Sequence, residues 1–253
     1  VGYIIVLIDI TRETEVNKLK NTFISNVSHE LRTPVTVLRT YIDTLCNNGD
    51  DFDENTKKEF MQTIDTEAKR LHTMVNDILD FSRLESGKMI LKKEYSNLST
   101  LIEQNINSIK ILADEKNIKI KFNTQENIPA VPINVESMDR VIRNLLSNAI
   151  KYSLDGKDII VSLKQSKEPD MIEFSVKDNG IGIAKEHLEK IFDRFYRVEN
   201  ATHTIKGTGL GLHLVKMTVE QYHHGKINVE SKENEGSIFT VTLPLKSHDN
   251  ELG

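Results

Sequence analysis

The chain has a single cysteine, no tryptophan and no apolar stretch long enough to cross a bilayer. With Cys46 alone, an internal disulfide is impossible, which fits a reducing compartment. A membrane span needs about 20 consecutive apolar residues. The apolar opening, residues 1–8, is shorter and has no basic flank of the kind found in a signal peptide, so it reads as a strand. We therefore expect this fragment to make no membrane contact.

Strong charge of either sign is also missing. A net charge of −5 gives no electrostatic case for binding nucleic acid. Internal repeats and low-complexity tracts are absent as well. What remains is a chain of 253 residues, 38% hydrophobic and 28% charged, which predicts a soluble protein with one or two ordinary cores.

The first chemical signal is the segment SHELRTP at residues 28–34. It lies on a predicted helix whose apolar side chains recur at steps of three and four, which places His29 on the opposite, solvent-facing side. Glu30 can hydrogen-bond one imidazole nitrogen and accept a proton while the other nitrogen attacks an electrophile. An isolated His–Glu pair is more often an ordinary solvated face, so the whole heptapeptide carries the signal. The apolar seam of the helix consists of Ile24, Val27, Leu31, Leu38, Tyr41 and Leu45.

A second long helix is predicted over residues 53–85, after a turn-rich segment at residues 47–51. Two such helices form an antiparallel hairpin, which cannot cover its own apolar seam. A second copy of the chain can cover it, so we expect a homodimeric four-helix bundle. The alternative is that the seam packs on the C-terminal half of the same chain. The apolar face of the second helix consists of Phe60, Ile64, Leu71, Val75, Ile78, Phe81 and Leu84.

After residue 95 strands and helices interleave, which predicts an α/β sandwich with its helices on one face of a mixed sheet. The overall fold class is therefore α+β, a helical hairpin followed by this sandwich. The predicted helices cover residues 98–115, 135–152, 185–191 and 210–223. The predicted strands cover residues 118–122, 159–163, 172–176, 226–230 and 237–243.

One helix of the predicted sandwich carries a polar face made of Asn144, Asn148, Lys151 and Tyr152. An amide oxygen is a hard ligand suited to Mg²⁺, and a nearby lysine adds a mobile positive charge. The pattern is weak by itself, because many helices place two asparagines four residues apart.

Two glycine-containing loops follow. Residues 178–182, DNGIG, come directly after a predicted strand, and a carboxylate there can accept a hydrogen bond from the exocyclic amine of adenine. A simple turn is the alternative. A calcium-binding loop is disfavoured, because the further acidic ligands at EF-hand spacing are missing. Residues 206–211, KGTGLG, lead into a helix, so backbone N–H groups and the helix N-terminus can hold phosphate. A dinucleotide fold competes for the second loop, but a polar segment precedes it where that fold needs a strand.

In their order along the chain, residues 28–34, 144–152, 178–182, 192–197 and 207–211 resemble the H, N, G1, F and G2 boxes of sensor histidine kinases of two-component systems. The resemblance covers residues 13–245. The segments 197–200 and 203–211 are similar to the cyanobacterial and algal-plastid branch of that family. The resemblance implies a dimerisation and phosphotransfer hairpin followed by an ATP-binding domain of the histidine kinase, Hsp90 and gyrase type.

The resemblance also implies a division of the chain and a setting for it. Residues 1–12 would end an upstream PAS-like sensor domain and linker, 13–90 would form the phosphotransfer domain, 91–246 the catalytic domain and 247–253 a tail. The fragment would lie on the cytoplasmic or stromal side, with its full-length parent anchored in a membrane.

The family pattern assigns roles at the nucleotide site. Asn148 would bind Mg²⁺, Asn144 would support the metal or the phosphates, Lys151 would contact phosphate, and Tyr152 would lie near adenine. Asp178, with the turn glycines Gly180 and Gly182, would recognise adenine. Arg194 or Arg197 would reach the γ-phosphate. Residues 197–206 resemble the mobile ATP lid, pinned at its base by Phe192, Phe195 and Tyr196. The phosphates would rest on Lys206, Gly207, Thr208, Gly209, Leu210 and Gly211.

The resulting hypothesis is attack of His29 on the γ-phosphorus of Mg²⁺-ATP, followed by transfer to an aspartate of a response regulator. Related gyrase and Hsp90 ATPases place a water-activating glutamate four residues before the metal asparagine. Here that position holds Asn144, which cannot take a proton, so direct hydrolysis is disfavoured. The resemblance also implies, through the family's H-E-x-x-T pattern, that Thr33 orients a water for dephosphorylating the regulator; an ordinary helix-surface threonine is the alternative. The alternative is a signalling scaffold that binds ATP without catalysis.

Overall fold

The computed structural model describes residues 11–85, 92–194, 196, 198 and 209–246. It divides into two compact units, residues 1–79 and residues 80–253, which are described one at a time. The predicted strand within residues 1–10, the tail after residue 246 and most of the predicted lid at residues 197–206 lie outside the described residues.

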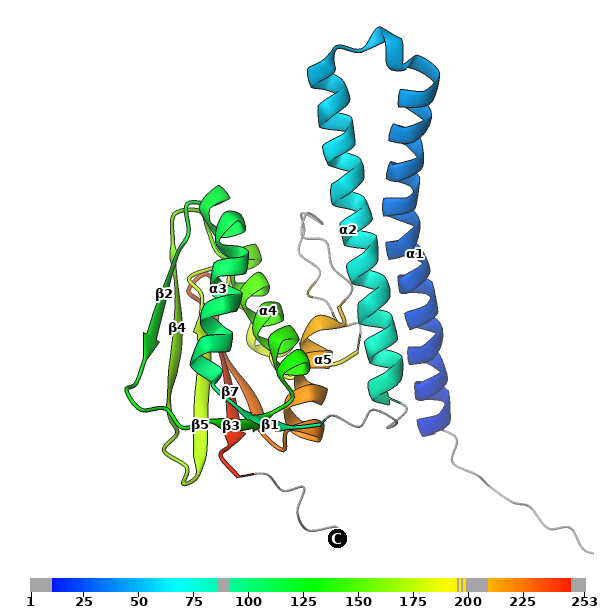
Figure 1. The fold of residues 1–253 in the computed structure, drawn as a ribbon. Coiled ribbons are helices and arrows are strands. Elements are labelled where there is room, and N and C mark those ends of the chain that lie inside the picture. Colours follow the sequence, from blue (N-terminus) through cyan, green and yellow to red (C-terminus); the bar gives the residue numbers. More distant parts are fainter. Residues whose placement is uncertain (1–10, 86–91, 195, 197, 199–208, 247–253) are drawn as a thin grey trace, which may run out of the picture. The chain divides into compact units, whose positions relative to one another are not determined.

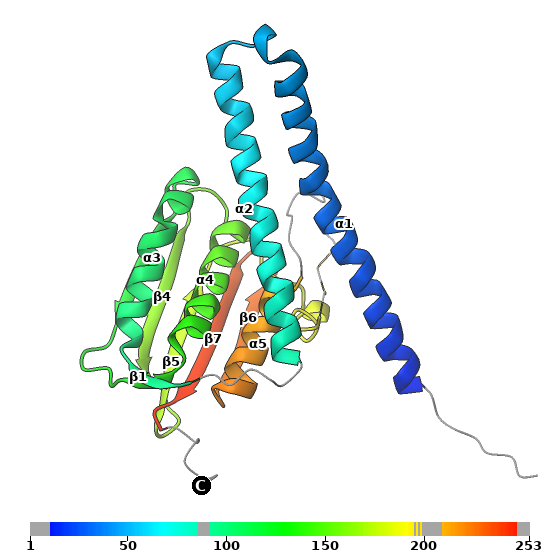
Figure 2. The ribbon, with the colours of Figure 1, turned by 45° about the vertical axis from the view of Figure 1, so that its right-hand side comes forward.

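The first unit is the predicted helical hairpin (Figures 1 and 2). Helix α1 (Thr11–Asn48) passes through Pro34 without interruption, a single 3₁₀ turn (Gly49–Asp51) reverses the chain, and helix α2 (Glu54–Glu85) returns beside α1. Near the turn, the Phe60 ring meets Tyr41 edge-on at a centroid distance of 5.0 Å and Phe52 at 5.3 Å. These aromatic contacts fasten the two helices together at the closed end of the hairpin.

The hairpin leaves much of its apolar surface uncovered. Of the α1 seam, Val27, Leu31, Leu38, Tyr41 and Leu45 are only half-buried, and Ile24 is exposed. Large apolar side chains of the unit with more than 40% of their surface exposed are Ile24, Val35, Ile42, Met61, Val75 and Leu79. A single hairpin therefore does not bury its own seam.

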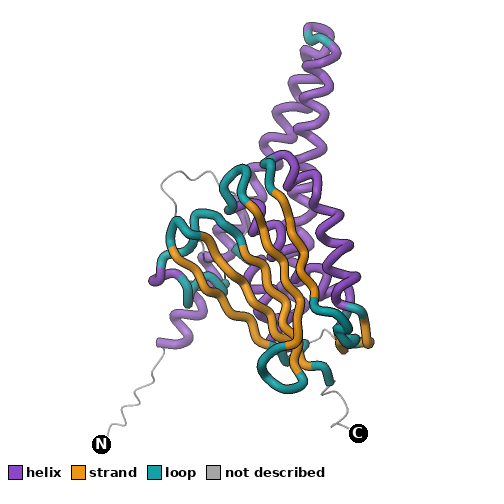
Figure 3. The backbone as a smooth tube through the Cα atoms, turned by 90° about the vertical axis from the view of Figure 1, so that its left-hand side faces the viewer, coloured by secondary structure: helices purple, strands orange, loops and turns teal. Residues whose placement is uncertain are grey.

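The second unit contains a five-stranded mixed sheet in the order β2-β4-β5-β7-β6. Only the β2–β4 pair is parallel. The predicted helices of the sandwich lie on one face of this sheet, and Figure 3 shows the strands from the other face. The strands are β2 (Lys119–Thr124), β4 (Asp158–Gln165), β5 (Met171–Lys177), β6 (Lys226–Lys232) and β7 (Gly236–Pro244).

The core of this unit lies between the sheet and helices α3 (Leu98–Glu115), α4 (Val135–Tyr152) and α5 (Gly211–Lys216). Alternate residues of β4 and β5, such as Val161 and Phe174, face the helices and are at most 1% exposed. Helix α4 buries the side opposite its two asparagines, including Leu145 and Leu146. The apolar faces predicted by the period of two in the strands and by the period of 3.6 in the helices thus pack against each other in one layer.

Three details differ from the sequence-based expectation. The helix predicted over residues 185–191 is reduced to a single 3₁₀ turn, Lys185–His187. The helix predicted over 210–223 is α-helical only to Lys216 and continues as a π-helical turn, Met217–Tyr222. A small antiparallel pair, β1 (Glu94–Ser96) with β3 (Val131–Ile133), was not predicted, because three-residue strands are too short to show alternation.

Candidate active site

In the first unit, His29 lies exposed on α1, on the side that the heptad pattern predicts. One turn later the Thr33 hydroxyl donates to the His29 carbonyl oxygen at 3.3 Å. A hydroxyl that donates to the helix backbone can still accept a hydrogen bond from a water. The imidazole is thus open to a phosphoryl donor, and a hydroxyl lies one turn away on the exposed surface.

Glu30 is half-buried between the two helices of the hairpin. Its Oε2 lies 3.3 Å from Nη2 of Arg70 on α2. Arg70 also pairs with Glu67, one turn earlier on α2, at 3.4 Å. The carboxylate next to the candidate phosphoacceptor is therefore held by a cation from the neighbouring helix, a contact that sequence spacing did not predict.

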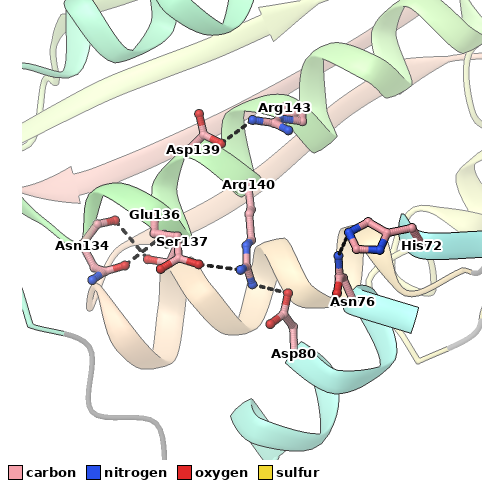
Figure 4. Close-up of polar contacts among 9 residues, drawn as sticks. All are labelled: His72, Asn76, Asp80, Asn134, Glu136, Ser137, Asp139, Arg140 and Arg143. Carbon is pink, nitrogen blue, oxygen red and sulfur yellow. Dashed lines mark hydrogen bonds and ion pairs between the residues drawn. The ribbon is translucent and has the colours of Figure 1, made fainter. Parts of the chain in front are cut away.

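In the second unit, α4 carries the predicted metal and phosphate ligands. Its first turn is capped by Asn134, whose Oδ1 accepts from the backbone N–H of Ser137 at 2.9 Å (Figure 4). Further along, Asn148 donates through Nδ2 to Oδ1 of Asn144 at 3.0 Å, and both side chains are half-buried. That bond uses the nitrogen of Asn148, so its Oδ1 is the atom suited to a metal.

The start of α5 comes up against this polar face of α4. A Cβ atom placed on Gly211 would lie 2.3 Å from Nδ2 of Asn144, so any larger residue there would displace the Asn144 amide. Gly209 precedes it with φ +70°, and Leu210 between them is fully buried. The structure thus brings together the asparagine helix and the described end of the glycine loop, as the sequence patterns predict for a phosphate site. Lys206, Gly207 and Thr208 lie outside the described residues.

The C-terminal end of α4 is joined to the Asp178–Gly182 loop. The Tyr152 carbonyl oxygen accepts from the Ile181 N–H at 3.2 Å, and Ser153 forms an antiparallel bridge with Gly180. Gly180 has no room for a side chain, because a Cβ there would lie 2.2 Å from the same carbonyl. The predicted phosphate contact Lys151 has its Nζ 5.1 Å from the centroid of the Tyr152 ring.

Lys116 supports this junction and was missed by sequence reasoning. Its Nζ donates to the carbonyl oxygens of Ile150 and Lys151 at 3.0 and 3.1 Å and to that of Ser153 at 3.4 Å. The last carbonyls of a helix have no partner within the helix and carry a partial negative charge. A lysine from the end of α3 therefore stabilises the end of α4 that carries the predicted nucleotide ligands Lys151 and Tyr152.

Asp178 is the buried carboxylate of the site, 4% exposed. Its Oδ1 accepts from the backbone N–H groups of Gly180 at 2.9 Å and Ser237 at 3.2 Å. Burial raises the pKa of the Asp178 carboxyl above its ordinary value of 3.8, while the two N–H groups oppose that shift. Both contacts engage Oδ1, so among the described residues Oδ2 is the oxygen on the side suited to a ligand. The support from Ser237 comes from a strand 59 residues later, so no local motif could reveal it.

Two of the three aromatic residues before the predicted lid, Phe192 and Tyr196, lie within the described residues. Phe192 is buried and packs edge-on against Phe239 at a centroid distance of 6.4 Å. Its carbonyl oxygen accepts a hydrogen bond from Nδ1 of His213 at 2.9 Å. The Tyr196 hydroxyl lies 2.7 Å from Nδ1 of His187. Arg194 is exposed. Phe195 and Arg197 lie outside the described residues.

The donor set suits ATP with Mg²⁺. Among the described residues no group of three or more His, Cys, Asp or Glu side chains could hold a metal ion alone. An asparagine oxygen beside a phosphate site is the sparse ligand set that Mg²⁺ accepts, because this ion keeps several waters and shares phosphate oxygens. The residues present therefore fit a nucleotide-borne Mg²⁺ held through Asn148.

Comparison with protein families agrees with both halves of this description. Residues 19–87 match the family described as "His Kinase A (phospho-acceptor) domain". Residues 133–247 match "Histidine kinase-, DNA gyrase B-, and HSP90-like ATPase". The chain belongs to the histidine kinase family, and the predicted fold class, a helical hairpin followed by an α/β ATP-binding domain, is confirmed.

Several curated relatives are named as sensors. The chain is 39% identical over 252 residues to "Drug sensory protein A" of Synechocystis sp., covering 96% of this chain and 38% of that protein. It is 36% identical to the "Uncharacterized sensor-like histidine kinase ycf26" of Pyropia yezoensis, with the same coverages, and 34% identical to "Sensor histidine kinase WalK" of Bacillus subtilis, covering 99% and 41%. The predicted similarity to the cyanobacterial and algal branch is confirmed by these relatives. The chain spans about two fifths of their length.

Solved histidine kinases have the same fold. The chain superposes on histidine kinase ThkA, solved in complex with response regulator protein TrrA, with a TM-score of 0.70 and 26% identity over 93% of this chain and 64% of that one. For Acinetobacter baumannii histidine kinase AdeS the TM-score is 0.68 at 23% identity, over 87% of this chain and 98% of that one. Separately, no helix in the described part of the chain is long and apolar enough to span a bilayer.

Proposed function

We propose that this chain is the kinase core of a sensor histidine kinase, which transfers the γ-phosphoryl group of ATP to His29 and then to an aspartate of a response regulator. The observation that carries the proposal is the pairing of an exposed histidine on a phospho-acceptor hairpin with a nucleotide site built around buried Asp178. The solved complex of the related ThkA with a response regulator supports the choice of acceptor.

In the proposed first step, an imidazole nitrogen of His29 forms a bond to the γ-phosphorus, and the bond from that phosphorus to the bridging oxygen of ADP breaks. The proton displaced from the ring passes to Glu30. Mg²⁺, when bound, neutralises charge on the phosphates. The N–P bond formed is labile in acid, and the phosphoryl group then passes to the regulator carboxylate.

In the nucleotide site, we assign adenine recognition to Oδ2 of Asp178 and metal binding to Oδ1 of Asn148. Asn144 and Lys151 face the phosphates, Tyr152 borders the adenine, and residues 206–211 hold the phosphate chain. Arg194 or Arg197 contacts the γ-phosphate. Asn144 stands four residues before Asn148 and is an amide, so it cannot activate water, and His29 is the acceptor.

Labelled ATP tests this function directly. The protein with Mg²⁺ and γ-labelled ATP should acquire label that is lost in acid and retained in alkali, and α-labelled ATP should leave none. Added receiver domains should then remove the label from the kinase. Acid-stable label, or nucleotide binding without labelling, contradicts the proposal, and the second result favours the ATP-binding scaffold.

We further propose that two copies of the chain pair through the hairpin. The exposed apolar side chains of α1 and α2 are the surface that a four-helix bundle would cover. Sedimentation equilibrium of the whole chain at micromolar concentration should give twice the mass of 28.9 kDa. Replacing Ile42 and Met61, 45% and 61% exposed, with glutamine should shift that equilibrium toward monomer. Purely monomeric wild-type protein would contradict the pairing.

Thr33 is proposed to orient the water that removes phosphate from the regulator. Its exposed hydroxyl lies one turn from His29 and can accept from water while donating to the His29 carbonyl. Thr33→Ala should slow regulator dephosphorylation at least tenfold and leave labelling of His29 within about twofold. Thr40→Ala, which removes the same kind of exposed backbone contact two turns later, is the matched control. Unchanged dephosphorylation in Thr33→Ala would show this assignment to be wrong.

For the rest of the chain, we propose the division given by the family pattern. Residues 1–12 end an upstream sensor and linker, 13–90 form the phosphotransfer domain, 91–246 the catalytic domain, and 247–253 a tail. The fragment acts on the cytoplasmic or stromal side of a membrane that anchors its parent. The chain's coverage of about two fifths of its relatives' length leaves room for such a sensor.

A further inference from the structure

Three charged side chains meet between the helices of the hairpin, beside the phosphoacceptor. They are Glu30 on α1 and Glu67 and Arg70 on α2, with 25%, 15% and 21% of their side-chain surface exposed. Nη2 of Arg70 lies 3.3 Å from Oε2 of Glu30, and Nη1 of Arg70 lies 3.4 Å from Oε2 of Glu67. Each terminal nitrogen of the guanidinium therefore faces a different carboxylate.

This geometry restricts the orientation of Arg70 from two sides. Glu67 lies three residues before Arg70 on the same helix, where side chains are neighbours. A guanidinium is planar, so a contact at one terminal nitrogen limits where the other terminal nitrogen can lie. The contact with Glu67 thus favours the orientation of Arg70 in which Nη2 faces Glu30 across the hairpin.

The cluster differs from the exposed ion pairs of the same unit. Lys69 pairs with Asp65 at 2.5 Å, but those side chains are 76% and 62% exposed. Arg39 pairs with Asp43 at 3.5 Å, with 83% and 60% exposed. Charges so exposed are screened by water and hold each other weakly. The Glu30, Arg70 and Glu67 side chains are screened less, so their contact has more power to restrict the position of Glu30.

We propose that Arg70 is a positioning residue for phosphorylation of His29, acting through Glu30. By holding the carboxylate of Glu30, the residue next to His29, against the second helix, it keeps the proton acceptor from extending into solvent. Proton transfer requires the acceptor within hydrogen-bond reach of the ring, so lost positioning lowers the rate of the chemical step and leaves ATP binding unchanged. The inference rests on the proposed function and adds to it a residue from the second helix.

A merely structural ion pair must be distinguished from this role. If Arg70 only stabilised the hairpin, removing it would affect every reaction that uses the hairpin. Transfer from phosphorylated His29 to a receiver aspartate supplies the needed contrast. In that step the ring loses no proton; it regains one as the phosphoryl group leaves, and because His29 is exposed, water can supply that proton without Glu30.

Arg70→Met is the test, made in the whole chain, with Lys69→Met as the matched control. We expect the kcat of His29 phosphorylation to fall about tenfold in Arg70→Met, with the KM for ATP within twofold of wild type. Transfer from phosphorylated His29 to a receiver domain should stay within twofold. Lys69→Met should match wild type in all three measurements. Arg70→Lys keeps the positive charge but has one nitrogen in place of the two that face Glu30 and Glu67, so its kcat should lie between those of Arg70→Met and wild type.

Several outcomes overturn the inference. An unchanged or raised kcat in Arg70→Met does so, as does an equal fall in phosphorylation and transfer, which shows a structural role. Should Arg70→Met fail to fold, Arg70→Lys and Glu67→Gln decide: a lowered kcat with unchanged transfer supports the inference, and wild-type rates in both overturn it. Wild-type protein without label at His29 contradicts the proposed function itself, and the inference with it.

Discussion

Replacing His29 with glutamine is expected to abolish acid-labile labelling from γ-labelled ATP. Glutamine has similar size and polarity, but its amide nitrogen is not a nucleophile, so no N–P bond can form. Because His29 is exposed, the change should alter the free energy of unfolding by less than about 0.5 kcal/mol. ATP affinity should remain at the wild-type value, since the nucleotide site lies on other elements. Label incorporation and fluorescent-nucleotide titration measure the two effects.

His72→Gln is the matched control for this experiment. His72 is another exposed histidine of the hairpin, on α2, with Nε2 3.0 Å from Nδ2 of Asn76 (Figure 4). The His72→Gln variant should incorporate as much label as the wild-type protein, because only the His29 imidazole is expected to accept the phosphoryl group. Acid-labile label that persists in His29→Gln, or that disappears in His72→Gln, would place the phosphoacceptor elsewhere.

Asp178→Asn is expected to weaken ATP binding about 100-fold, because the new amide N–H group would face the amine of adenine, and neither can accept a hydrogen bond. In the folded protein the two backbone N–H groups occupy Oδ1, and an asparagine oxygen can replace it there. The asparagine Nδ2 would then point where Oδ2 accepts from the adenine amine in our proposal. Two donors would face each other in a buried site. Isothermal titration with ATP measures the loss, and Asp170→Asn, an exposed carboxylate of the same unit paired with Lys246 at 2.6 Å, should bind normally.

The same substitution should change how stability depends on pH. Burial raises the pKa of the Asp178 carboxyl in the folded state above its ordinary value of 3.8. The folded protein therefore binds the proton more tightly than the unfolded chain. This group's contribution to stability is fully present below pH 3.8 and is lost as pH rises through the folded-state pKa.

Asp178→Asn cannot ionise, so its free energy of unfolding should rise relative to wild type between acidic and neutral pH. Urea unfolding of the two proteins at several pH values measures this difference. A constant difference across pH would show that Asp178 ionises as easily in the folded protein as in the unfolded chain. Normal ATP affinity in Asp178→Asn would show that its carboxylate does not read adenine.

The bounds of α3 and α4 were predicted correctly because local signals agree with tertiary packing in both helices. Each begins after an asparagine whose side chain accepts a backbone N–H, Asn97 for α3 and Asn134 for α4. Each also buries one continuous apolar face. The segment at 185–191 has helix-forming residues too, but the structure keeps only one 3₁₀ turn there. Propensity without a matching buried surface does not fix a helix.

By itself, the sequence determined the fold class, the exposed place of His29 and the order of the nucleotide motifs, because these depend on periodicity and on short-range spacing. The tertiary structure alone decided which distant groups support them. Arg70 reaches Glu30 across 40 residues, Lys116 reaches the end of α4 across 34 or more, and Ser237 reaches Asp178 across 59. Such contacts arise where the chain folds back on itself, and a charged or polar residue shows no sign in the sequence of which distant partner it will meet.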